Sequence, residues 1–173
     1  MAFEIYWSAR DLAGSPVGNH QFILIYVDPI FGLPPFSVLE EKDKRFVTLG
    51  AFSIGGNLEF QANEPSDVKS VRESIDTKKR GWFSDFDLEK NKVPSPLASD
   101  QKFAETLVKQ ALAFKVNIQS KKIKYTLVNK NCSAWVNMMF KIAGVTEHNR
   151  NSYGEFNGVD WGEEDLLDEN LFV

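Results

Sequence analysis

The chain contains one cysteine and two histidines, and these side chains are its candidates for nucleophilic catalysis. Cys132 follows Asn131 at the start of a stretch with helical spacing, where the amide groups that open a helix stabilise a thiolate. An imidazole can take the thiol proton, and such pairs usually meet in the fold rather than in the sequence. The sequence therefore predicts Cys132 as a nucleophile that works with a histidine.

The two histidines differ in their surroundings. His20 lies where a loop enters an apolar strand, a place that fixes the backbone and can aim the ring into a cleft. His148 lies in a polar segment after the cysteine helix, so we predict that it is a surface residue. His20 is therefore the predicted base. A hydrogen-bonded strand-end histidine and a cysteine that packs as a small hydrophobe are the structural alternatives.

Composition limits the classes of function. With 173 residues, of which 43% are hydrophobic, the chain predicts one domain over residues 1–173 with a real core. A net charge of −4 argues against a dedicated nucleic-acid binder. One cysteine excludes an intrachain disulfide and a zinc site of several thiolates. No metal or cofactor is expected, and the acidic run Glu163-Glu164-Asp165 is interpreted as a solvated tail.

The N-terminus has no basic region followed by an apolar run, so no Sec-type signal peptide is predicted. No apolar stretch approaches the roughly 20 residues that span a bilayer, so no stable membrane insertion is expected. We expect synthesis in a cytoplasm, and any action elsewhere requires another export route.

The pattern of apolar residues predicts strands first and helices later. The expected strands cover residues 3–9, 21–27, 45–52, 58–61 and 123–128, with 21–27 as a central strand buried on both faces. Helices are expected over 66–75, for about four turns after Ser99, and between Asn131 and Gly144. Segments 11–19, 29–44 and 78–96 are expected to be irregular, and the tail from Asn149 is glycine-rich and then acidic. This order predicts an α+β fold.

Two segments together carry a family resemblance: Gly18-Asn19-His20-Gln21-Phe22-Ile23-Leu24-Ile25 and, far downstream, Asn131-Cys132-Ser133-Ala134-Trp135-Val136-Asn137. In this order they resemble the circularly permuted branch of the NlpC/P60 papain-like superfamily, which includes lecithin:retinol acyltransferase-like (LRAT-like) proteins. The chain looks most like bacterial type VI secretion effectors and polymorphic-toxin domains, and the tail from Phe156 to Gly162 is similar to their C-terminal segment. The resemblance implies an antiparallel sheet packed against a helix that carries the nucleophile Cys132 at its N-terminus, with His20 as general base.

That family usually adds a third polar residue, which orients the imidazole from the strand after the histidine strand. No histidine, aspartate or glutamate lies at a matching position here. The polar residues near that region are Ser53, Thr48, Gln61 and Asn63. The third member stays open among these four, a Cys–His dyad and a backbone carbonyl.

The resemblance implies a cysteine hydrolase that cleaves an amide bond, with a peptidoglycan stem peptide as the expected substrate. It also implies export by a specialised secretion system to a target-cell periplasm, as an antibacterial effector with a secretion carrier and an immunity protein as candidate partners. The first alternative is a lipid-directed acyl hydrolase or acyltransferase of the LRAT-like type, which exposed apolar surface beside Cys132 would favour. The second is a non-catalytic binding domain, which would leave Cys132 buried and far from His20.

Overall fold

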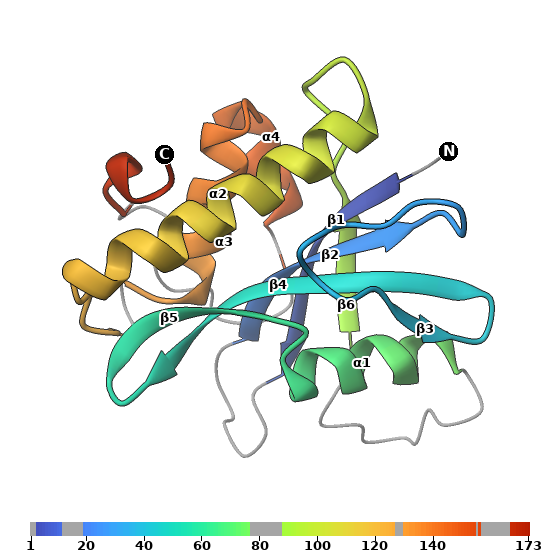
Figure 1. The fold of residues 1–173 in the computed structure, drawn as a ribbon, viewed down its shortest axis with the longest axis horizontal. Helices are drawn as coiled ribbons and strands as arrows, with labels where there is room; N and C mark the ends of the chain where they lie inside the picture. Colours follow the sequence, from blue (N-terminus) through green and yellow to red (C-terminus); the bar gives the residue numbers. More distant parts are fainter. Residues whose placement is uncertain (1–2, 12–18, 77–87, 127–129, 155, 157–166) are drawn as a thin grey trace.

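The computed structural model describes residues 3–11, 19–76, 88–126, 130–154, 156 and 167–173. They form an α+β fold in which one antiparallel sheet has helices on both faces (Figure 1). The strands are β1 (Phe3–Asp11), β2 (Asn19–Val27), β3 (Leu39–Glu41), β4 (Lys44–Ile54), β5 (Asn57–Ala62) and β6 (Leu88–Lys92). The helices are α1 (Pro65–Ile75), α2 (Asp100–Ser120), α3 (Cys132–Ile142) and α4 (Glu147–Tyr153), followed by a 3-10 turn at Glu169–Leu171.

The sheet runs in the order β3-β4-β2-β1-β6, and β5 also pairs with β4. Each of these pairings is antiparallel. β2 lies between β1 and β4, and every residue from His20 to Val27 is buried. The prediction of a central strand buried on both faces is therefore confirmed, as expected for its run of aromatic and β-branched side chains.

Alternation along β1 and β2 divides the core into two layers. Odd positions such as Trp7 and Ile23 pack with α2 and α3, including Trp135 of α3. Even positions such as Phe22 pack with Val71 of α1 on the other face. Figure 1 shows the same division, with α2, α3 and α4 above the sheet and α1 below it. One end of β2 can therefore meet side chains from both helical layers.

Caps set the ends of the two long helices. The Ser99 hydroxyl accepts the amide of Lys102 at 3.1 Å, so α2 begins as predicted, but it continues for 21 residues rather than four turns. Asn131 caps α3, and Gly144, at φ +95°, follows its last turn, as predicted. Among the described residues, no helix has the length and apolar character needed to cross a membrane.

Some sequence expectations were wrong. The strand over 123–128 is absent from its described part, where Lys124 and Thr126 each make only an isolated bridge. β3 and β6 fall within segments expected to be irregular, and α4 begins at Glu147 in the polar segment around His148, where no helix was predicted. Each is short and mostly polar, so its hydrophobic periodicity is weak. The rest of 123–128, residues 12–18 and 77–87, and the tail over 157–166, with Glu163, Glu164 and Asp165, lie outside the described residues.

Candidate active site

Cys132 is the first residue of α3, and its position follows from the cap. The Asn131 side chain accepts the amide of Ala134 at 3.0 Å, and the Asn131 carbonyl accepts the amide of Trp135 at 3.1 Å. The amides of Cys132 and Ser133 therefore open the helix, where they have no acceptor within it and where the helix dipole is positive. This end of α3 favours a negative charge on the cysteine sulfur.

His20 and Cys132, the two residues that the sequence pairs, are brought together as hydrogen-bond partners. Each residue is almost fully buried, with 4% of His20 and 5% of Cys132 exposed. Burial alone would raise the pKa of the thiol, but the charge of His20, its hydrogen bond, the Gln21 amide and Ser133 together lower it. Burial opposes charge on His20, yet Asp67 and then Cys132 raise the pKa of the imidazole to about 10. The arrangement therefore favours a thiolate beside an imidazolium.

A third residue, Asp67, faces the same imidazole from α1. Its Oδ2 lies 3.4 Å from His20 Nε2, an ion-pair contact slightly long for a hydrogen bond, and the carboxylate is fully buried. With Nε2 facing Asp67, Nδ1 is the ring nitrogen left for Cys132. Cysteine, imidazole and carboxylate thus form a series in which the carboxylate can fix the ring and stabilise its positive charge.

The start of α1 explains why Asp67 lies there. Pro65 is the first residue of the helix, and the preceding Glu64 caps it by accepting the amides of Ser66 at 2.8 Å and Asp67 at 3.2 Å. Asp67 therefore lies in the first turn of α1, which packs on the face of the sheet that carries the even-numbered side chains of β2. The capped start of the helix thus fixes the position of the Asp67 main chain independently of the contact with His20.

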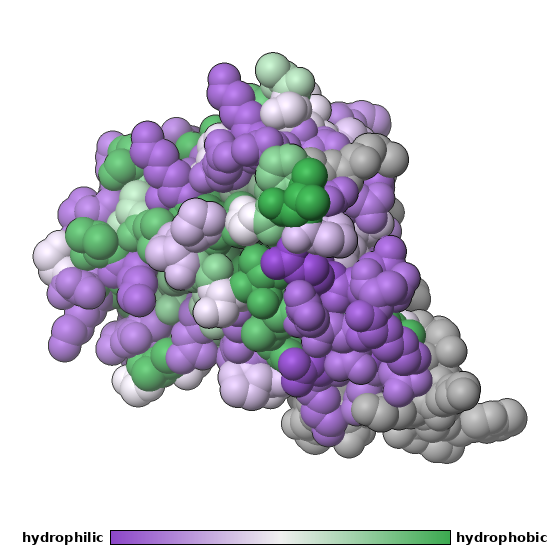
Figure 2. Space-filling view, turned by 45° about the vertical axis from the view of Figure 1, so that its right-hand side comes forward, coloured by the Kyte–Doolittle hydropathy of each residue, from purple (hydrophilic) through white to green (hydrophobic). Residues whose placement is uncertain are grey.

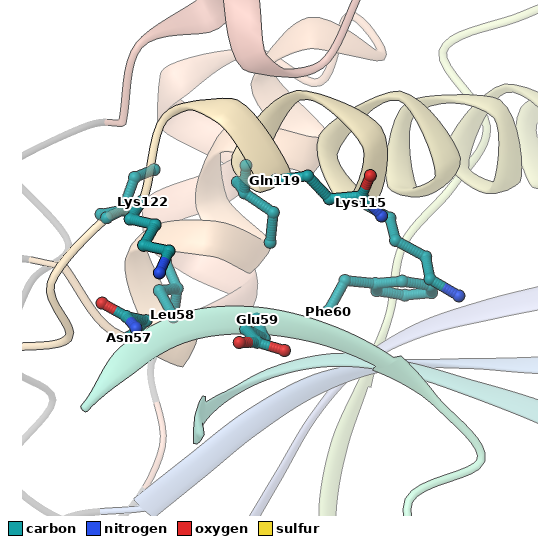
Figure 3. A pocket seen from close by; sticks show the side chains of 9 residues that line it. Asn57, Leu58, Glu59, Phe60, Lys115, Gln119 and Lys122 are labelled. Carbon is teal, nitrogen blue, oxygen red and sulfur yellow. The ribbon is translucent and has the colours of Figure 1, made fainter. Parts of the chain in front are cut away.

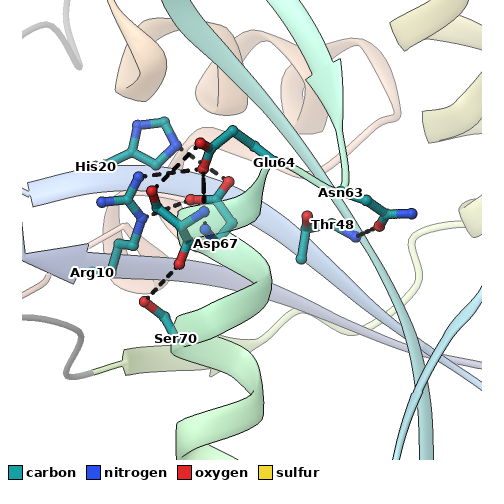
Figure 4. A network of polar contacts seen from close by, with 8 residues as sticks. Arg10, His20, Thr48, Asn63, Glu64, Asp67 and Ser70 are labelled. Carbon is teal, nitrogen blue, oxygen red and sulfur yellow. Dashed lines mark hydrogen bonds and ion pairs between the residues drawn. The ribbon is translucent and has the colours of Figure 1, made fainter.

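Arg10 completes a polar network around this carboxylate (Figure 4). Arg10 Nε donates to Asp67 Oδ1 at 2.7 Å, while Nη2 lies 3.7 Å from Glu64 Oε2. Figure 4 shows Arg10, Glu64 and His20 converging on the start of α1, where Asp67 lies. The two oxygens of Asp67 are divided between partners, since Oδ1 faces Arg10 and Oδ2 faces His20.

Aromatic rings hold the imidazole on its other sides. The ring of Phe52 stacks on His20 with centroids 4.4 Å apart, and Phe22 stacks at 6.1 Å. Gly50 lies under this arrangement: an added Cβ would come within 2.9 Å of Phe52 and 3.3 Å of Asp67 Oδ2. The glycine leaves room for the carboxylate and the clamping ring to approach His20 together.

Tyr125 adds a hydroxyl beside the sulfur, as a hydrogen-bond partner of Cys132. Its backbone is fixed by its amide, which donates to the Gly56 carbonyl at 2.9 Å at the turn before β5. Burial, then the charge of Cys132 and their hydrogen bond, raise the pKa of Tyr125, so the phenol stays protonated and acts as a donor. Sequence reasoning assigned Tyr125 only to a strand.

None of the four polar candidates for the third member takes that place. Ser53 is exposed, and the Thr48 amide donates to the Asn63 side chain at 3.0 Å, in a separate part of the network (Figure 4). Gln61 lies on β5, half-buried. An aspartate in the first turn of a helix is common because it complements the helix dipole, so nothing in the sequence singled out Asp67. His148 is exposed on α4, as predicted.

A separate hollow of about 210 Å³ lies between β5 and the end of α2 (Figure 3). It is lined on one side by Asn57 to Phe60 and on the other by Lys115, Ile118, Gln119, Lys122 and Ile123. The lining includes none of the residues grouped around Cys132. Within the described parts of the chain, no group of three or more histidine, cysteine, aspartate or glutamate residues could hold a metal ion.

Comparison with known proteins adds no relative. No protein-family description, no curated protein and no solved structure matches this chain. The resemblance to the permuted NlpC/P60 branch therefore stays a prediction, which rests on the order of His20 and Cys132.

Proposed function

We propose that the protein is a cysteine hydrolase in which Cys132 is the nucleophile, His20 the general acid and base, and Asp67 the residue that orients His20. The observation that carries the proposal is the series Cys132–His20–Asp67, assembled from α3, β2 and α1. A lowered thiol pKa and a raised imidazole pKa are what a thiolate nucleophile requires. The permuted papain-like fold is part of the same proposal.

The reaction would proceed by acyl transfer. The Cys132 thiolate attacks the carbonyl carbon of an amide and forms a tetrahedral intermediate. His20 gives its proton to the leaving nitrogen as the C–N bond breaks, which releases an amine and leaves a thioester. Water then attacks the thioester and gives a proton to His20, and a carboxylic acid leaves as the thiolate is restored. Asp67, whose Oδ2 lies 3.4 Å from His20 Nε2, would stabilise the imidazolium at the start of the reaction and again when it re-forms during hydrolysis of the thioester.

The developing oxyanion needs donors near the sulfur. The amide of Cys132, at the opening turn of α3, and the protonated Tyr125 hydroxyl are the candidates. The amide is part of the backbone, and the Tyr125 main chain is fixed by the hydrogen bond from its amide to the Gly56 carbonyl. Such preorganised donors stabilise the transition state without having to reorient during the reaction.

The proposed substrate is a peptidoglycan stem peptide, and the proposed role is that of an exported antibacterial effector. The alternative of a lipid substrate gains less support. The large apolar residues that are exposed in the described parts of the chain are Ile30, beyond the far end of β2, Val116 on α2 and Val173 at the C-terminus. On the face drawn in Figure 2, hydrophobic residues lie in small groups among hydrophilic ones. A non-catalytic binding domain would not need an imidazole and a carboxylate in series with its cysteine.

Purified peptidoglycan sacculi provide the test. The wild-type protein should release soluble fragments and generate new amino groups, while Cys132→Ala and His20→Gln should lose at least about a hundredfold in rate. His148→Gln is the matched control, because it removes the other, exposed histidine and should keep full activity. Undiminished hydrolysis by Cys132→Ala would contradict the nucleophile. Fatty-acid release from ester-lipid vesicles, with intact sacculi, would favour the lipid alternative.

A further inference from the structure

Arg10 is a buried cation next to the proposed site, and the removal of its guanidinium from water is unfavourable. Its side chain on β1 is only 8% exposed, and a buried guanidinium is retained only when well-placed partners compensate for its lost hydration. Its Nε lies 2.7 Å from Oδ1 of the fully buried Asp67. β1 is also hydrogen-bonded to β2, and Arg10 is the direct neighbour of His20 in that pairing. The sheet therefore places Arg10 and His20 side by side below the same carboxylate.

The contacts of Arg10 and His20 with Asp67 use different oxygens of the carboxylate. A carboxylate can rotate about its terminal bond, and an aspartate with one partner can face it with either oxygen. Here Arg10 holds Oδ1, and Oδ2 is left facing His20 Nε2 at 3.4 Å. Glu64 limits the movement of Arg10 in turn, because its Oε2 caps α1 and lies 3.7 Å from Arg10 Nη2. The chain of contacts from Glu64 through Arg10 to Asp67 leaves one orientation for the carboxylate.

We propose that Arg10 is a positioning residue, which holds the Asp67 carboxylate turned toward His20 so that the Cys132 thiolate is maintained. This inference rests on the proposed function. Among the described residues, the charged and titratable groups around His20 are Arg10 on β1, Glu64 and Asp67 on α1, Cys132 on α3 and, beside the sulfur, Tyr125. Without Arg10, the Asp67 carboxylate would lose the hydrogen bond that holds Oδ1, and with it its fixed orientation. The loss of that orientation weakens the stabilisation of the imidazolium.

A purely structural role makes a different prediction. An arginine that only joins β1 to α1 would lower stability when replaced and leave the ionisation of Cys132 unchanged. A cation that only repelled the imidazolium would, on removal, make the thiolate more stable. Because Cys132 is the single cysteine of the chain, thiolate absorbance in the ultraviolet reports this one site once the spectrum of Cys132→Ser is subtracted.

The experiment titrates the thiolate in the wild type, Arg10→Gln, Asp67→Asn and the double variant. We expect Arg10→Gln to move the midpoint up by about one pH unit, and to cause little further shift when position 67 already carries asparagine. Arg10→Lys keeps the positive charge but loses the planar guanidinium with its fixed donors. Its midpoint should therefore lie between those of the wild type and Arg10→Gln. An unchanged or lowered midpoint in Arg10→Gln, or an equal shift in both backgrounds, would overturn the proposal.

Two controls complete the design. Arg45→Gln removes a second anchored arginine, which donates from Nη1 to the carbonyls of Asp28 and Phe31 at the opposite end of the β2–β4 pairing, and should not move the midpoint. If Arg10→Gln does not fold, Arg10→Lys decides: an unchanged midpoint overturns the proposal, and a raised one supports it. The titration needs no substrate, so it tests the role of Arg10 separately from the proposed function. A protein that does not hydrolyse sacculi can still show the expected shifts, and one that hydrolyses them can fail to show these shifts.

Discussion

Asp67, in the first turn of α1, contacts His20 with its Oδ2 3.4 Å from Nε2. α1 covers one face of the sheet, and α3, which carries Cys132, covers the other. The carboxylate is fully buried, so its charge is weakly screened and its effect on the imidazole is strong. The proposed site thus joins the two helical layers at the end of β2.

Replacement of Asp67 by asparagine should therefore reduce hydrolysis without moving the ring far. The amide keeps the size of the side chain but removes the charge that stabilises the imidazolium, and we expect kcat to fall by roughly 10²–10⁴-fold. Asp76→Asn is the control, since Asp76 ends α1 and pairs with Lys42 at 2.9 Å. Hydrolysis rates with sacculi measure both variants. Equal losses in the two variants would place the effect in α1 as a whole.

The ion pair of Cys132 and His20 predicts a bell-shaped dependence of its stabilisation on pH. The folded pKa of the thiol is lowered, so the contribution of the thiolate is lost as pH falls through that value. The folded pKa of His20 is raised from 6.5 to about 10, so the contribution of the imidazolium is lost as pH rises through about 10. Between these limits the folded protein holds both charges.

Urea denaturation of the wild type and Cys132→Ser across pH tests this. The difference between their free energies of unfolding should increase with pH from the lowered pKa of the folded thiol toward its ordinary value of 9.0, by up to about 1.4 kcal/mol per pH unit, and decrease as pH approaches about 10. A difference that stays constant with pH would show that the thiol is not ionised beside His20.

Tyr125→Phe should weaken the thiolate and slow acyl transfer. The substitution removes one hydroxyl donor to a buried charge and leaves the ring, so the packing should be retained while the pKa of Cys132 rises. A hydrogen bond to a charged group contributes about 1.5–3 kcal/mol, which corresponds to a loss of roughly tenfold or more in rate. Tyr6→Phe, which removes a half-buried hydroxyl beside Glu4, is the control. Equal rates for Tyr125→Phe and the wild type would exclude the proposed donor.

Local sequence signals predicted much of the frame. The apolar run of β2, the caps at Ser99 and Asn131, and Gly144 after α3 all lie where the sequence placed them. Each depends on neighbours in the chain, such as a capping side chain and an amide three residues later. The pairing of Cys132 with His20 was also predicted, because two histidines left little choice.

The remaining parts depend on contacts between distant segments. Asp67 lies 47 positions after His20 in the numbering, and only the packing of α1 against the sheet brings its carboxylate to the imidazole. Arg10 likewise meets Asp67 only because β1 pairs with β2. The polar strands β3 and β6 are stabilised by pairing at the sheet edges, where weak periodicity suffices. Such contacts leave no local pattern in the sequence.

Gly50→Ala tests whether the space under His20 matters. The new methyl group would lie 2.9 Å from a carbon of the Phe52 ring and 3.3 Å from Asp67 Oδ2, so Phe52 must move, and with it the stacking at 4.4 Å on His20. We expect a loss of about 1–3 kcal/mol in the free energy of unfolding and a clear fall in hydrolysis at temperatures where the variant is folded. Gly32→Ala is the matched control, because its nearest neighbour would be Pro34 Cδ at 3.9 Å, an ordinary contact. Full activity of a folded Gly50→Ala protein would show that the ring and carboxylate can shift without consequence, and the proposed clamp on His20 would then be wrong.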